Sequence, residues 1–132
     1  MVSIAIDGPA GAGKSTIARA VARNLGYIYV DTGALYRAIG FYAVDSGIAP
    51  SDADTLVPML KNIAVELVYQ NDEQRILLCG RDVSEEIRRP EMGLAASGVS
   101  AIPEVRAFLL EMQRDMARRH NVVMDGRDIG TV

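Results

Sequence analysis

Gly8-Pro9-Ala10-Gly11-Ala12-Gly13-Lys14-Ser15 is the stretch that decides the fold of this chain. It matches the pattern G-x-x-x-x-G-K-[ST] of phosphate-binding loops at every fixed position. The short apolar stretch 2–6 precedes it and predicts a buried strand. The residues after it predict a helix that ends before Gly26, with apolar side chains on one face at Ile17, Val21 and Leu25. The motif therefore has the strand–loop–helix context that favours a ligand-binding loop over a plain glycine-rich turn.

The loop predicts how phosphates are bound. Its glycines allow backbone conformations and close ligand approach that other residues do not. The backbone N–H groups and the positive end of the following helix then face an anion. Lys14 can reach the β- and γ-phosphates, and the Ser15 hydroxyl can ligate Mg²⁺. We therefore expect the phosphates of a nucleotide to be bound by Gly8, Pro9, Ala10, Gly11, Ala12, Gly13, Lys14, Ser15 and Thr16.

Composition narrows the class of protein. A chain of 132 residues is one domain at most, and its net charge of −3 gives no global basic field for nucleic acid. The single cysteine, Cys79, excludes an internal disulfide and favours a reducing compartment. It lies in an apolar run, so we expect it to be buried and inert. The first residues contain no basic segment and include Asp7, so we do not expect them to be a secretory signal. No apolar run in the sequence approaches membrane-spanning length.

The first half of the chain predicts a βαβ unit followed by an insertion. Residues 27–30 read as a second strand, parallel to the first. A helix is expected from residue 34 to about residue 45. A further helix begins with a capping serine at Ser51 and is kinked or shortened by Pro58. Alternating apolar residues over 65–79 then predict an antiparallel hairpin, which is foreign to a parallel sheet.

The second half returns to helices and ends on a strand. The stretch 80–84 is expected to be a turn, and Ser84 to cap a new helical start. Helices are predicted over 90–101 and from Pro103 onward, the second with a core stripe of Val105, Leu109, Met112 and Met116. A third parallel strand, 121–125, follows.

Ligands of parallel α/β sheets bind beyond the carboxyl ends of the strands. Thr32 follows the second strand, and Arg127 and Asp128 follow the third. Arg37 lies about one helical turn beyond Thr32, where it can face the same edge, although a solvated surface charge is the commoner role of a helix arginine. The residues at this edge are therefore the candidates for binding an anionic substrate.

Three motifs together resemble bacterial cytidylate kinase: the phosphate loop, Asp31-Thr32-Gly33-Ala34-Leu35-Tyr36-Arg37, and Asp125-Gly126-Arg127-Asp128-Ile129-Gly130-Thr131-Val132. The resemblance covers the whole chain in order, including the hairpin insertion. Phosphate loops are widespread, whereas the combination of the second and third motifs is specific.

The resemblance implies an α/β fold, that of P-loop nucleoside monophosphate kinases. Its parallel sheet is flanked by helices and is expected here with about three parallel strands, and a small antiparallel insertion joins it. Residues 1–58 would be the first part of the P-loop core, 59–98 the insertion that binds the nucleoside monophosphate, and 99–132 the continuation of the core.

The resemblance also implies the chemistry and the site. The reaction would be transfer of the ATP γ-phosphoryl group to CMP or dCMP, with Mg²⁺, as part of pyrimidine metabolism in the cytoplasm. Arg37 and Arg127 would hold the acceptor phosphate and, with Lys14, be the catalytic residues. Ser97 would contact the nucleoside. The cytosine edge would be read by Thr32, Arg106 and Asp128, and their chemistry suits it, since a carboxylate accepts from the amino group and a guanidinium donates to the ring nitrogen.

Members of this family continue past position 132 with two more parallel strands, a lid that carries further arginines, and C-terminal helices. We therefore expect either an N-terminal part of an enzyme, whose full-length form is a monomer, or a truncated gene product. The family's sheet order would leave the first strand at an exposed edge here, so the 132-residue chain is expected to self-associate. Two alternatives stay open: another small-molecule P-loop kinase, and a nucleotide-binding piece without turnover.

Overall fold

The structure is a computed structural model that describes residues 1–6 and 14–125. The side chains of Lys14, Ser15 and Asp125 lie outside that description. The chain divides into two compact units, one made of Met1–Asp31 with Leu110–Val132 and the other of Thr32–Leu109. We describe each unit by itself.

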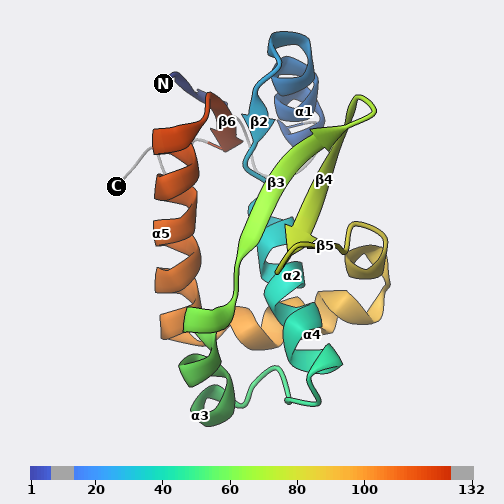
Figure 1. Cartoon of the computed structure of the whole chain (residues 1–132), viewed down its shortest axis with the longest axis vertical. Coiled ribbons are helices and arrows are strands. Elements are labelled where there is room, and N and C mark those ends of the chain that lie inside the picture. The colour runs from blue at the N-terminus through green and yellow to red at the C-terminus, as the bar shows by residue number, and fades with distance from the viewer. Residues whose placement is uncertain (7–13, 126–132) are drawn as a thin grey trace. The chain divides into compact units, whose positions relative to one another are not determined.

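The first unit contains the predicted parallel sheet. Its strands are β1 (Ser3–Ile6), β2 (Ile28–Tyr29) and β6 (Val122–Asp125), in the order β1-β6-β2. Both outer strands pair in parallel with β6, and α1 (Lys14–Leu25) packs beside the sheet (Figure 1). The two strands of the first βαβ unit are thus parallel but not adjacent. Within the described residues β1 has β6 on one side and no strand on the other, so the edge position expected for it is confirmed, while self-association stays a prediction.

Helix α1 buries small side chains and exposes larger ones. Ala18 and Ala22 are fully buried and cluster with Tyr29 and Val123. Ile17, by contrast, is more than half exposed, and so is Leu25 at the end of the helix. Val21 is partly buried and packs against the same cluster, so of the three residues expected on the buried face only Val21 contributes to it. Alanines at the contact let a helix approach a sheet closely.

The second unit contains the remaining elements and the whole of the stretch 59–98. Pro58 ends the α-helix as expected, because it cannot donate to the ladder, and the chain continues as a 3₁₀-helix. The N-cap of the α-helix before Pro58 lies one residue later than predicted, since Asp52 rather than Ser51 accepts the Thr55 N–H. The elements are α2 (Thr32–Asp45), α3 (Ala53–Leu56), η1 (Val57–Asn62), β3 (Val65–Gln70), β4 (Glu73–Leu78), β5 (Arg81–Asp82), η2 (Glu86–Arg88), α4 (Glu91–Ser100) and the start of α5 (Pro103–Arg119).

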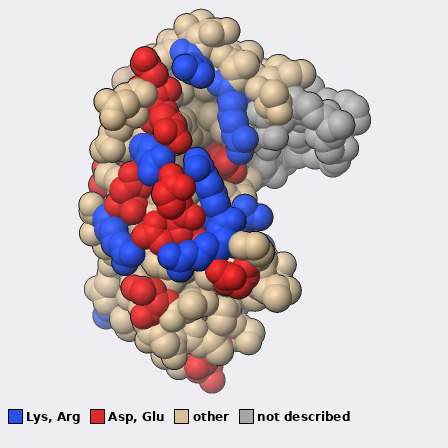
Figure 2. Space-filling model, turned by 90° about the vertical axis from the view of Figure 1, so that its right-hand side faces the viewer, with Lys and Arg blue, Asp and Glu red and all other residues tan. Residues whose placement is uncertain are grey.

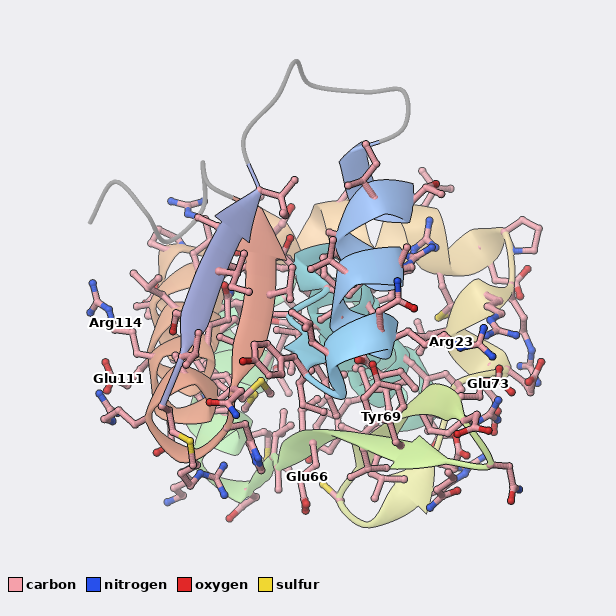
Figure 3. All side chains as sticks on the ribbon, turned by 90° about the horizontal axis from the view of Figure 1, so that it is seen from above. Arg23, Glu66, Tyr69, Glu73, Glu111 and Arg114 are labelled. Carbon is pink, nitrogen blue, oxygen red and sulfur yellow. The ribbon has the colours of Figure 1, made fainter. Side chains whose placement is uncertain are left out.

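Within the stretch 59–98, the strands β3-β4-β5 form a three-stranded antiparallel sheet joined by two tight hairpins. From here on, the insertion means this sheet with the segment that follows it, residues 65–89. Both residues of each two-residue loop have positive φ, at Asn71-Asp72 and at Cys79-Gly80, which is the type I′ geometry that hairpins favour. Side chains alternate along β3, and Figure 3 shows Glu66 and Tyr69 on this strand. The expected simple turn over 80–84 is wrong, because β5 pairs with β4.

Cys79 is exposed, so the expectation that it is buried is wrong. The apolar run before it suggested a strand interior, but the run ends one residue earlier, at Leu78. Cys79 is the first loop residue of the second hairpin, where its φ is 51°.

Asp82 holds the insertion together internally. Its carboxylate accepts hydrogen bonds from the Ser84 N–H at 2.9 Å and from Arg75 Nε at 2.9 Å. The Ser84 hydroxyl accepts the Ile76 N–H at 2.9 Å, so Ser84 joins β4 to the loop rather than capping a helix as predicted. Hydrogen bonds from Ser84 and then from Arg75 lower the pKa of Asp82 to about 2.

Further ion pairs surround this centre. Arg75 also pairs with Glu73 and Glu85, and Arg88 pairs with the same two acids. Acidic and basic side chains are interleaved on the face of the molecule drawn in Figure 2. Because each arginine has acidic neighbours, this patch offers little uncompensated positive charge.

No single helix among the described residues is long and apolar enough to cross a membrane. The pair α4 and α5 meets the criterion of length and composition only jointly, and the two helices are bent by 98°.

We expect Cys79→Asn to stabilise the chain by about 0.5–1 kcal/mol, because asparagine followed by glycine suits a type I′ turn whereas cysteine is strained at positive φ. Urea unfolding of the two proteins measures the difference. Cys79→Ala is the control, since it removes the thiol without easing the backbone. Equal stability of the Asn and Ala variants would contradict the assignment of the turn.

Asp82 should make stability depend on pH. Its pKa is about 2 in the folded chain against 3.8 in the unfolded reference, so its stabilising contribution is present above about pH 4 and is lost as pH falls toward 2. The advantage of the wild type over Asp82→Asn in the free energy of unfolding should therefore shrink over that interval. Glu66→Gln, at an exposed carboxylate of the same sheet, serves as the control. An advantage that stays constant down to about pH 2 would contradict the assigned pKa.

Candidate functional site

Four of the predicted substrate-binding residues lie in the second unit. Thr32 is the first residue of α2 and is half-buried, whereas Arg37 on the same helix is exposed. Ser97 is exposed on α4, and Arg106 is exposed in the first turn of α5. The structure thus brings to one compact unit residues that are 74 positions apart in the sequence, counted from 32 to 106.

The other predicted residues fall partly or wholly outside the description. Gly8, Pro9, Ala10, Gly11, Ala12, Gly13, Arg127 and Asp128 lie outside the described residues. The backbone of Lys14 and Ser15 is described and forms the start of α1, and Thr16 is exposed in its first turn. Their roles stay predictions.

Helices α2 and α4 are packed against each other without room for a side chain at Gly40. A Cβ atom at this position would lie 2.9 Å from the carbonyl carbon and 2.9 Å from the Cβ of Ala95. Gly98 approaches Pro50 in a similar way, because a Cβ atom added at Gly98 would lie 2.9 Å from the Cβ of Pro50. These contacts fix α4, which carries Ser97, on α2, which carries Arg37.

Arg37 has no ion pair and no side-chain hydrogen bond with any residue in the described ranges. Most arginines of the insertion are neutralised by acids, so Arg37 differs from them. A guanidinium has five donors, and one without a partner among the described residues is well suited to a phosphate, which it can bind in a bidentate manner. The chemistry of Arg37 therefore agrees with its predicted role.

Arg106 is oriented by the end of α4. Its Nη1 donates to the Ser100 carbonyl oxygen at 2.9 Å, and that carbonyl is the last of the helix. Cations are stabilised at this end of a helix, where carbonyl groups lack intrahelical partners. Arg106 thus has a neutral partner and keeps its positive charge and its other donors for a ligand.

Ser100 is a residue that the sequence reasoning missed. Its hydroxyl donates to the Ser97 carbonyl at 3.0 Å, while its own carbonyl accepts from Arg106. Ser100 therefore connects two predicted substrate-binding residues. The sequence offered one signal for this contact. Pro103 predicts a helix start three residues before Arg106, which places Arg106 in the first turn of α5, close to the end of α4.

The start of α1 suits a phosphate donor. The first turn of this helix contains no acidic residue, so the positive end of its dipole is not neutralised from within. In the same unit, Asp31 pairs with Arg19 at 3.1 Å. No group of three or more His, Cys, Asp or Glu side chains that could hold a metal ion occurs in the described part of the chain. The binding of Mg²⁺ by Ser15 stays a prediction, because the side chain of Ser15 lies outside the described residues.

Comparison with known proteins assigns the family. The sequence model of the family described as cytidylate kinase matches residues 4–132. The cytidylate kinase of Symbiobacterium thermophilum is 54% identical over 129 residues, which cover 97% of this chain and 57% of that relative. The cytidylate kinase of Caldanaerobacter subterraneus subsp. tengcongensis is 51% identical over 131 residues, 99% of this chain and 57% of the relative. The cytidylate kinase of Caldicellulosiruptor bescii is 48% identical over 130 residues, which cover 98% of this chain and 58% of the relative.

The chain thus spans somewhat more than half the length of these relatives. The match runs from β1 through the phosphate loop to the Asp125-Gly126-Arg127-Asp128 stretch, so it includes all the motifs on which the resemblance rested. The observed parallel sheet with its antiparallel insertion agrees with the expected fold class. The chain belongs to the cytidylate kinase family.

Proposed function

We propose that the protein is a phosphotransferase that moves the γ-phosphoryl group of ATP to CMP and dCMP, giving CDP and dCDP. The observation that carries the proposal is the family match over residues 4–132, which contains both the phosphate loop and the Asp125-Gly126-Arg127-Asp128 stretch. We place this activity in pyrimidine nucleotide metabolism in the cytoplasm.

The donor is bound by residues 8–16. Backbone N–H groups of the loop and of the first turn of α1 bind the phosphates, and Lys14 contacts their β- and γ-oxygens. Ser15 holds Mg²⁺, which supplies positive charge to the phosphates when bound. The acid-free first turn of α1 supports this assignment, since an acidic residue there would repel the donor.

The acceptor phosphate is held by Arg37 and Arg127. Phosphoryl transfer needs little covalent chemistry from the protein, and most of the catalysis comes from alignment and charge stabilisation. Two arginines on the acceptor phosphate overcome its repulsion by the donor and keep the attacking oxygen in line. The unpaired state of Arg37 among the described residues supports this role.

The base is read by Thr32, Arg106 and Asp128, and Ser97 contacts the nucleoside. The Asp128 carboxylate accepts from the exocyclic amino group of cytosine, and Arg106 donates to the ring nitrogen beside it. Uracil presents an oxygen in place of the amino group, so the carboxylate disfavours UMP. The anchoring of Arg106 on the Ser100 carbonyl supports its role, because a held guanidinium loses less entropy on binding.

The proposal is tested by measuring ADP formation with CMP, dCMP, UMP, AMP and no acceptor. The assay is run on the 132-residue chain and on a chain extended to the length of the relatives. CMP should be the preferred ribonucleotide acceptor. A preference for AMP, or ADP formation that needs no acceptor, would contradict the proposed function.

Lys14→Ala should reduce turnover by about 10²–10³-fold and weaken ATP binding. Removing one donor that stabilises the charge developing in the transition state lowers kcat by a factor of this order. Steady-state kinetics of the extended chain measure the loss. Lys61→Ala is a matched control, because Lys61 is the only other lysine of the chain and is exposed. Near-normal turnover of Lys14→Ala would contradict the assignment of the loop.

Asp128→Ala should lower kcat/KM for CMP far more than for UMP. A lost hydrogen bond to a charged group is worth roughly 1.5–3 kcal/mol, or roughly 10- to 150-fold. The amide of Asp128→Asn can donate to uracil as well as accept from cytosine. This variant should therefore lower the ratio of kcat/KM for CMP to kcat/KM for UMP. Equal losses for CMP and UMP would show that Asp128 does not read the amino group.

A further inference from the structure

Arg81 makes three contacts, two of which join the insertion to helix α2, while the third holds the side chain to η2. Its Nη2 lies 2.8 Å from Glu86 Oε2 of η2, and its Nη1 lies 3.9 Å from Asp45 Oδ2 of α2. Its guanidinium carbon lies 5.4 Å from the centre of the Phe41 ring, also of α2. We propose that Arg81 clamps the insertion onto α2 and thereby acts as a positioning residue for the acceptor site.

The three contacts need an arginine. The Phe41 ring is almost fully buried, with 6% exposure, and so offers a fixed face on which a planar guanidinium can stack. The two ion pairs are made by different nitrogens of the same fork, toward acids on two different elements. A lysine ammonium is a single point charge and cannot satisfy the stack and both acids at once.

The clamp lies on the same face of α2 as Arg37. Arg37, Phe41 and Asp45 follow one another at intervals of four residues, so they lie on successive turns of one helix face. The contacts of Arg81 therefore continue the row that begins with the predicted ligand of the acceptor phosphate. A shift of the insertion along this row would change the surroundings of Arg37.

The Asp82 centre cannot replace the clamp. Asp82, Arg75 and Ser84 join β4, β5 and the following loop to one another, so they make the insertion rigid internally. Among the described residues, the side-chain bonds of these three residues stay within the insertion and do not reach α2. Arg81, the neighbour of Asp82 on β5, is the residue that pairs across from the insertion to an acid of α2.

The clamp is tested by hydrogen exchange in the 132-residue chain. In Arg81→Met, exchange of the Cys79 and Val83 amides, which donate to Ala64 and Ile76, should become roughly threefold faster or more. The Tyr27 amide, in the first unit, should not change. Arg89→Met is the matched control, because Arg89 is exposed in the same insertion and its guanidinium pairs with no acid in the described ranges. Unchanged exchange in Arg81→Met would overturn the clamp.

The positioning role, which rests on the proposed function, is tested by equilibrium binding of CMP and of ATP to the same variants. Arg81→Met should weaken CMP binding roughly threefold to tenfold and leave ATP binding unchanged, and Arg81→Lys should restore only part of the loss. Equal weakening of both nucleotides would indicate a general loss of structure and overturn the role.

The two proposals can fail separately. Unaltered CMP affinity in Arg81→Met, with faster exchange, would overturn the positioning role while leaving the proposed function intact. Failure of the wild-type chain and of its extended form to bind CMP would contradict the proposed function and with it the positioning role, and the exchange rates would still decide whether Arg81 clamps the insertion.

Discussion

The contact between α2 and α4 at Gly40 is the constraint on which the second unit depends. A Cβ at this position would lie 2.9 Å from backbone and side-chain atoms of Ala95, closer than side chains normally come to other atoms. Backbone-to-backbone packing of this kind leaves little freedom for one helix to slide on the other. Because Arg37 and Ser97 are carried by these two helices, their positions are set by rigid elements rather than by loops. Binding sites supported in this way need little reorganisation when a ligand arrives.

The arginines of the second unit have different partners, and the partners indicate different roles. Arg75 and Arg81 of the insertion pair with acids, so their charge is used to hold the sheet and to attach it to α2. Arg37 has no acidic partner among the described residues, and Arg106 donates to a neutral carbonyl. With a net charge of −3 the chain has no general attraction for anions. Local cations left unneutralised are therefore what an anionic acceptor can use.

Much of the architecture could be predicted from local sequence patterns. The phosphate-loop motif and its flanking stretches predicted the parallel strands and the helix between them, and alternation over 65–79 predicted the hairpin. Pro58 and Pro103 were correctly interpreted as a helix end and a helix start, because proline acts through its own fixed φ and missing N–H. The site could be proposed as a set of residues because the motifs are contiguous and specific. These features depend on neighbours in the chain, so the chain alone determines them.

Other features depended on contacts between distant residues, and only the tertiary structure decided them. The buried face of α1 was misjudged at Ile17 and Leu25, because Ala18 and Ala22 make the close contacts of this helix. On α5, Gln113 is buried, whereas its neighbour Met112 is only half-buried. Cys79 is exposed because the register of β4 with β5 makes it a turn residue. The insertion of β6 between β1 and β2, the anchoring of Arg106 at the end of α4 and the stacking of Arg81 on Phe41 had no local signature. Local patterns determine which elements form, whereas the packing of their surfaces determines which side chains meet.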